Sequence, residues 1–291
     1  MDDAGKWLAD TAWLASHLHA PDLVVLDGSM HLASSGRDAK SEYEAAHIPG
    51  ALFFDIDEIS DRSSPLPHML PPATMFASRM KRMGIGDGMH IIAYDSEGLY
   101  SAARVWWMFR AMGHREVRVL NGGLRKWKAE ERPLEDGPAR PRSPRHFTAV
   151  RNAELIRDAA DVSSLIGSRS AQIVDARDAA RFAGRAPEPR PGLRSGHIPG
   201  SLNVPFASLV NPDGTMRSAD ELAAIFTTAG VDPAGRVVAS CGSGVTAGII
   251  ALALAVLGRA DAAVYDGSWS EWGGDHRLPV ETGPGRQPSR P

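Results

Sequence analysis

Residues 237–257 read VVASCGSGVTAGIIALALAVL. A β-branched apolar run stops at Cys241, glycines follow at 242 and 244, and a helix-forming segment begins at once, which predicts a strand, a tight loop and a helix. Gly242 and Gly244 let the loop turn sharply and direct several backbone N–H groups inward. These groups and the positive end of the helix dipole favour thiolate over thiol at Cys241. A lone cysteine is often a small buried apolar side chain, but this context predicts a nucleophile.

The length and composition of the 291-residue chain limit the classes of protein to which it can belong. This length predicts two domains, each able to bury its own core. A net charge of −3 with mixed signs argues against nucleic acid as a partner. One cysteine permits no internal disulfide, the first residues contain no apolar signal segment, and the longest apolar run, 245–257, is too short to span a bilayer. We therefore expect a cytoplasmic protein that has no membrane partner.

An internal repeat sets the domain organisation. HIPG occurs at 47–50 and again at 197–200, VVLD at 24–27 returns as QIVD at 172–175, and NGG at 121–123 returns as DGS at 266–268. The offsets stay near half the chain length, so two copies of one fold lie in tandem. We predict a first domain over 1–130, a linker rich in proline and arginine over 131–150, a second domain over 151–282, and a poorly ordered tail, 283–291, in a proline- and glycine-rich segment that starts at Glu281.

Strand and helix patterns alternate within each copy. In the first copy we predict strands at 23–26, 91–94 and 117–120 and helices at 41–46, 101–112 and 124–129. In the second copy we predict strands at 173–174, 237–240 and 262–265 and helices at 219–228 and 246–257. This alternation predicts the α/β class, with a mainly parallel sheet flanked by helices in each copy. Right-handed crossovers place the loop that carries Cys241 at the carboxyl edge of its sheet, where α/β sites are built.

The two copies differ at the position of the cysteine. Asp95 in the first copy occupies the place of Cys241 in the second. A carboxylate cannot replace a thiolate as a soft nucleophile, so we expect covalent chemistry only in the second domain. The polar residues that recur in both copies are interpreted as structural: Asp27 and Asp175, His47 and His197.

Several motifs together resemble those of the rhodanese superfamily, and within it the 3-mercaptopyruvate sulfurtransferases. They are the repeated HIPG, the CGSGVT loop at 241–246, and YDGSW at 265–269 followed by Glu271 and Trp272. The resemblance covers residues 7–282 and implies two tandem rhodanese-like domains. It also implies transfer of a sulfane sulfur from 3-mercaptopyruvate, through a cysteine persulfide, to an acceptor, with release of pyruvate. The implied acceptors are a thiol, such as thioredoxin or a low-molecular-weight thiol, or cyanide, and no metal or organic cofactor is implied.

The resemblance also assigns roles to particular residues. Cys241 matches the nucleophile, and the loop around its sulfur matches Gly242, Ser243, Gly244, Val245 and Thr246. Arg181 and Arg190 match the arginines that hold the carboxylate and ketone of the substrate, a task that suits a planar guanidinium. Asp57 and His68 match residues that form a proton relay with Ser243, and histidine can move a proton at neutral pH.

Three alternatives compete with the hypothesis of a 3-mercaptopyruvate sulfurtransferase. Thiosulfate sulfurtransferases of the superfamily usually carry cationic residues just after the cysteine, whereas Gly242 and Ser243 are neutral, so thiosulfate is expected to be the weaker donor. A cysteine-dependent phosphatase needs an arginine six positions after the cysteine, and Ala247 stands there. A non-catalytic rhodanese-like binding module would have no need for Cys241 and the matched arginines.

Overall fold

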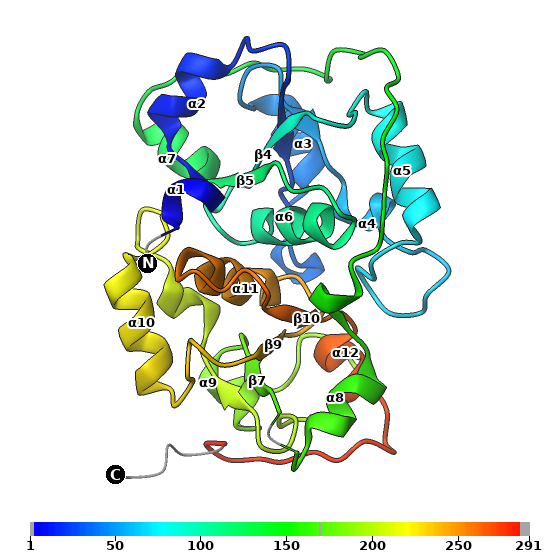
Figure 1. Ribbon diagram of the computed structural model, residues 1–291, viewed down its shortest axis with the longest axis vertical. Coiled ribbons are helices and arrows are strands. Elements are labelled where there is room, and N and C mark those ends of the chain that lie inside the picture. The colour runs from blue at the N-terminus through cyan, green and yellow to red at the C-terminus, as the bar shows by residue number, and fades with distance from the viewer. Residues whose placement is uncertain (1–2, 169, 286–291) are drawn as a thin grey trace.

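The computed structural model describes residues 3–168 and 170–285, which form two α/β units stacked along the long axis of the molecule (Figure 1). The strands of the first unit are β1 (Leu8–Ala9), β2 (Leu23–Asp27), β3 (Leu52–Phe53), β4 (His90–Tyr94) and β5 (Val117–Leu120). Its helices are α1 (Ala4–Trp7), α2 (Thr11–His17), the 3-10 helix η1 (Ala33–Ser35), α3 (Ala39–Ala45), α4 (Ile56–Ile59), α5 (Ala73–Arg82), α6 (Ala102–Ala111) and α7 (Gly123–Ala129).

The second unit repeats this arrangement. Its strands are β6 (Ile156–Arg157), β7 (Gln172–Asp175), β8 (Leu202–Asn203), β9 (Val237–Ser240) and β10 (Ala263–Tyr265). Its helices are η2 (Ala153–Leu155), α8 (Ala159–Leu165), α9 (Ala179–Phe182), η3 (Phe206–Leu209), α10 (Ala219–Thr228), α11 (Ala247–Val256) and α12 (Ser268–Trp272). The strand orders are β1-β5-β4-β2-β3 and β6-β10-β9-β7-β8, and the strand pairs are parallel. The predicted fold class, with tandem parallel α/β units, is confirmed.

The long apolar segments lie where the sequence pattern predicts them. The bounds of β5, β9 and α10 coincide with the prediction, and the other predicted elements start and end within two residues of it. The pattern missed the four edge strands β1, β3, β6 and β8, because two residues are too few to show alternation. It also missed α5, although its buried Phe76 and Met80 have the i, i+4 spacing of an amphipathic helix.

The largest apolar cluster spans both units, and each unit also buries a smaller cluster of its own. In Figure 1, α6 and α11 lie side by side between the two sheets. All ten residues of α11 are buried, because one face covers its own sheet and the other packs on the first unit. A Cβ on Gly248 would lie 2.8 Å from the carbonyl oxygen of Ala103, so the glycine allows the two backbones to approach closely. Smaller apolar clusters cover the outer face of each sheet.

The segment between α7 and η2 runs as an extended trace along the first unit (Figure 1). It pairs with the HIPG turn through an antiparallel bridge between His47 and Glu135. The second unit has the equivalent bridge between His197 and Glu281, and the N–H of Gly283 donates to the carbonyl of Ala183. The prediction of a poorly ordered segment that starts at Glu281 is therefore wrong for residues 281–283. Residues 286–291 of the predicted tail lie outside the described residues.

The repeated histidines stabilise these turns. The His47 ring stacks on Tyr43 with centroids 4.1 Å apart, and the His197 ring stacks on Phe182 at 3.9 Å. Each Nδ1 is hydrogen-bonded to the carbonyl of the residue on which the ring stacks. These contacts support the structural interpretation of both histidines. Over residues 3–168 and 170–285, no helix is long and apolar enough to cross a membrane.

Candidate active site

Cys241 lies directly after β9, at the carboxyl edge of the second sheet, and is 1% exposed. The first turn of α12 holds its loop from behind. The Cys241 N–H donates to Ser268 Oγ at 3.1 Å, and the Cys241 carbonyl accepts from the Trp269 N–H at 3.0 Å. The Gly242 carbonyl accepts from both the N–H and the hydroxyl of Ser270, each at 2.8 Å. The backbone around the sulfur is thus fixed before any ligand binds.

The equivalent loops of the two units differ in how their backbone donors are satisfied. In the first unit the Asp95 carboxylate accepts five N–H groups at 2.7–3.0 Å, from Glu97, Gly98, Tyr100, Ser101 and Ala102. In the second unit the N–H groups of residues 242–246 have no acceptor within the described chain. The first unit therefore fills its nest with its own carboxylate, whereas the second leaves donors open around the Cys241 sulfur.

A cavity of about 170 Å³ opens onto this loop. Five loop residues line it, namely Cys241, Gly242, Ser243, Val245 and Thr246. Both units contribute the other walls: Met30, Leu32 and Tyr100 from the first, and Arg177, Arg181, Pro189, Arg190 and Phe206 from the second. The volume is below the roughly 300–1,000 Å³ of sites for drug-sized ligands. The cavity is therefore suited to a small acid.

Two of the three arginines on this cavity already have carboxylate partners. Arg181 approaches Gly242 so closely that a Cβ there would lie 3.2 Å from its Nη2, and the same Nη2 lies 2.5 Å from Glu188 Oε2. Arg177 is buried and pairs with Glu188 at 2.7 Å and with Asp175 at 2.6 Å. Glu188 thus holds both guanidinium groups in place and offsets part of their charge.

The third arginine contacts the predicted proton relay. Arg190 has no carboxylate partner among the described residues, and its Nη2 lies 3.1 Å from His68 Nε2. Because the guanidinium can only donate, Nε2 is the acceptor and the ring proton is on Nδ1. Nδ1 donates to Asp57 Oδ1 at 2.7 Å, and this hydrogen bond lowers the pKa of Asp57 below its usual value. Within the described chain, Ser243 Oγ lies on the cavity wall without a hydrogen bond to His68.

A buried ion pair joins the relay to the cysteine loop, and the sequence analysis did not predict it. Arg104 of α6 donates through Nη1 to Asp266 Oδ1 at 2.6 Å and to the Gly244 carbonyl at 3.2 Å. Its Nη2 donates to the carbonyl of His68, a residue with φ of +61°. Asp266 accepts in addition from the Leu70 N–H at 2.7 Å. Arg104 therefore fixes the His68 segment of the first unit against the cysteine loop of the second.

A closer comparison of the two copies would have signalled both missed arginines. Counted from Asp95 and Cys241, the position of Arg104 corresponds to Ile250, so a charge stands in an otherwise apolar helix. Counted from the repeated aspartates, Arg177 corresponds to Ser29. Such asymmetry between repeats marks residues that serve the site and not the repeated fold.

A cysteine at the end of a central strand, followed by a loop with unpaired N–H groups and next to a cationic cavity, is typical of a cysteine-dependent group-transfer enzyme. The chain belongs to the rhodanese-like domain family, which matches it twice, over residues 10–130 and 158–275. It is 46% identical over 271 residues to 3-mercaptopyruvate sulfurtransferase of Homo sapiens, covering 91% of each chain. It is 44% identical over 282 residues to thiosulfate sulfurtransferase of Rattus norvegicus, covering 94% of each chain.

A solved structure agrees with these relatives. The fold superposes with a TM-score of 0.83 on the crystal structure of a 3-mercaptopyruvate sulfotransferase from Escherichia coli, at 42% identity over 91% of this chain and 99% of that one. The predicted family is confirmed, and so is the expected enzyme class, the sulfurtransferases.

Proposed function

We propose that the enzyme transfers a sulfane sulfur from 3-mercaptopyruvate, through a persulfide on Cys241, to a thiol or cyanide acceptor and releases pyruvate. The observation that carries the proposal is the cavity that joins Cys241, its unpaired loop N–H groups, Arg181 and Arg190. The loop residues Gly242, Ser243, Gly244, Val245 and Thr246 would surround the sulfur, and the two arginines would hold the carboxylate and ketone of the substrate.

In the first half-reaction the Cys241 thiolate attacks the sulfur of 3-mercaptopyruvate. A sulfur–sulfur bond forms as the substrate carbon–sulfur bond breaks, and the electron pair of that bond passes into the enolate of pyruvate. The proton of the substrate thiol moves to the enolate carbon, so pyruvate leaves and the persulfide stays as an anion in the nest. We assign this proton transfer to His68, with Asp57 orienting its ring and Ser243 on the cavity wall.

In the second half-reaction an acceptor thiol attacks the outer sulfur of the persulfide. The acceptor becomes a persulfide, and Cys241 leaves as a thiolate, ready for another donor. Since the chain has a single cysteine, no second thiol of its own can resolve the persulfide, and the acceptor must come from outside. A thioredoxin dithiol, a low-molecular-weight thiol or cyanide would each serve, by a double displacement with ping-pong kinetics.

The charge of the cavity favours 3-mercaptopyruvate over thiosulfate as the donor. Relatives named for either donor match the chain at similar identity, so the choice is argued from the site. Apart from Cys241, the cavity carries three guanidinium groups, of Arg177, Arg181 and Arg190. The carboxylates of Asp175 and Glu188 pair with the first two arginines, which leaves one net positive charge. That charge matches a 2-oxo monoanion better than the thiosulfate dianion.

Steady-state sulfur transfer to cyanide tests the choice of donor. We expect kcat/KM for 3-mercaptopyruvate to exceed that for thiosulfate by at least about tenfold, or roughly 1.4 kcal/mol of transition-state binding. A preference for thiosulfate would overturn the charge argument while leaving the nucleophile intact. Absence of transfer from both donors would favour the binding-module alternative.

His68→Asn tests the proton relay. Asparagine tolerates the left-handed backbone of His68 but cannot shuttle a proton, so kcat with 3-mercaptopyruvate should fall by about 10²-fold or more. His276→Gln, at an exposed turn, is the matched control and should leave kcat unchanged. If His68→Asn keeps the kcat of the wild type, the relay assignment is wrong.

We further propose a role for each part of the chain. Residues 1–130 form a domain that lacks the catalytic cysteine but contributes His68, Asp57 and Tyr100 to the site. Residues 131–150 connect the domains, and residues 151–282 form the domain that carries Cys241. The single cysteine suits a reducing compartment, and we place the enzyme in the cytoplasm.

A further inference from the structure

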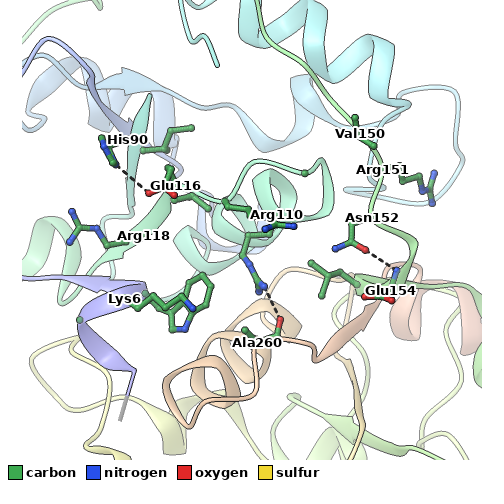
Figure 2. A pocket seen from close by; sticks show the side chains of 17 residues that line it. Lys6, His90, Arg110, Glu116, Arg118, Val150, Arg151, Asn152, Glu154 and Ala260 are labelled. Atoms are coloured by element: carbon green, nitrogen blue, oxygen red, sulfur yellow. Dashed lines mark hydrogen bonds and ion pairs between the residues drawn. The ribbon is translucent and has the colours of Figure 1, made fainter. Parts of the chain in front are cut away.

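A second cavity, of about 1,080 Å³, lies where the two units meet, at the end of α6 away from Cys241 (Figure 2). Tyr100, just before α6, lines the cysteine cavity, whereas Arg110, in the last turn of α6, lines this one. The remaining walls come from α1, from the starts of β4 and β5, from residues 150–155 and from Ala260 of the second unit. Neither the sulfur-transfer chemistry nor the relay uses this cavity.

Positive charge gathers around this cavity in a chain whose net charge is −3. Its walls carry five cationic side chains: Lys6, Arg110, Arg115, Arg118 and Arg151. They carry two carboxylates, Glu116 and Glu154, and Glu116 lies 3.5 Å from His90 Nδ1. None of the five cations has a carboxylate partner within residues 3–168 and 170–285. The walls themselves therefore have an excess of three positive charges.

Arg110 is the cation for which this lack of a counterion is most costly. Its guanidinium lies over the rings of both Trp7 and Trp106, at 4.6 and 4.7 Å from their centroids, and donates to the Ala260 carbonyl at 2.8 Å. Burial, aided by Arg115, lowers the pKa of Arg110 to about 10. The negative end of the α6 dipole offsets part of its charge. The same dipole does not offset the charges of Arg118, Lys6 and Arg151, because these residues belong to other segments.

We propose that this cavity binds an anion that carries two linked phosphate groups, such as a nucleoside diphosphate. The cations come from separate segments around a volume far larger than one inorganic ion, so a ligand with a single charged group could not reach them together. At neutral pH a nucleoside diphosphate carries about three negative charges, about one on the inner phosphate group and up to two on the outer one, which matches the excess of three positive charges. Guanidinium groups bind phosphate oxygens in bidentate fashion, and the exposed Arg115 and Arg151 are free to do so.

Calorimetric titration of the full chain in moderate salt without magnesium tests this site, with adenosine diphosphate, inorganic pyrophosphate and inorganic phosphate as probes. We expect the two diphosphate probes to bind at least about tenfold more tightly than phosphate. Tighter binding of adenosine diphosphate than of pyrophosphate would show that the nucleoside contributes, and equal binding would assign the site to the diphosphate group alone. Either result supports the proposal.

The variants Arg115→Gln and Arg151→Gln test whether the anion binds in this cavity. Both side chains are exposed, so the fold should persist, and unchanged sulfur transfer would confirm that it does. Each change should weaken diphosphate binding by about tenfold. Arg277→Gln, which removes an exposed charge elsewhere, and Arg181→Gln, in the cysteine cavity, should leave it unchanged. The proposal is overturned if diphosphate does not bind at millimolar concentration, if binding survives both changes, or if it depends on Arg181.

Discussion

Cys241→Ser is expected to abolish sulfur transfer, lowering kcat/KM for 3-mercaptopyruvate by at least about four orders of magnitude. The backbone nest, Arg181 and Arg190 remain in the variant, so it should still bind the donor. A serine hydroxyl is hardly ionised at neutral pH and cannot store sulfur as a persulfide. Mass spectrometry after incubation with 3-mercaptopyruvate should show one added sulfur atom on the wild-type chain and none on the variant.

Ser96→Ala is the matched control for this change. Ser96 lies in the equivalent loop of the first unit, next to Asp95, and its hydroxyl has no hydrogen-bond partner among the described residues. Its loss should leave sulfur loading and kcat/KM within about twofold of the wild type, or less than about 0.5 kcal/mol. A Cys241→Ser variant that still accepts sulfur would show that Cys241 is not the carrier.

Arg104→Met is expected to lower the free energy of unfolding by about 3–5 kcal/mol, because it leaves the buried Asp266 carboxylate without its counterion. It also removes the donors to the carbonyls of Gly244 and His68. The latter bond secures a residue at positive φ, so kcat/KM should fall as well. Urea unfolding followed by tryptophan fluorescence would measure the loss. Arg277→Met, in an exposed pair with Asp275, is the matched control and should leave the unfolding midpoint unchanged.

A double-mutant cycle separates the ion pair from general packing. Asp266→Asn removes the charge that Arg104→Met leaves uncompensated, so the double variant should be more stable than the sum of the single changes predicts, by about 1–3 kcal/mol. Additive changes would mean that Arg104 acts through its contacts with Trp107 and the rest of α6 and not through Asp266.

Local patterns were sufficient to predict the catalytic strand, loop and helix. The run from Val237 to Ser240 is long enough to show β-branched burial, and Gly244 adopts φ of +79°, as a sharp turn requires. The substitution of Asp95 for the cysteine was also visible, because the repeat supplied an internal alignment. The five donors on Asp95 were not visible, because hydrogen-bond geometry depends on how the loop closes.

By itself, then, the sequence determined the duplication, the parallel α/β class and the strand, glycine loop and helix around Cys241, because each depends on residues that are neighbours along the chain. The family resemblance added Arg181, Arg190, Asp57 and His68 as candidates. Only the tertiary structure decided that Glu188 holds Arg181 and that Arg190 contacts His68. It alone joined Arg104 to Asp266, 162 positions apart, because packing α6 against α11 brings a buried charge of one unit to the loop of the other. Such contacts have no local periodicity and arise only when the two sheets share a core.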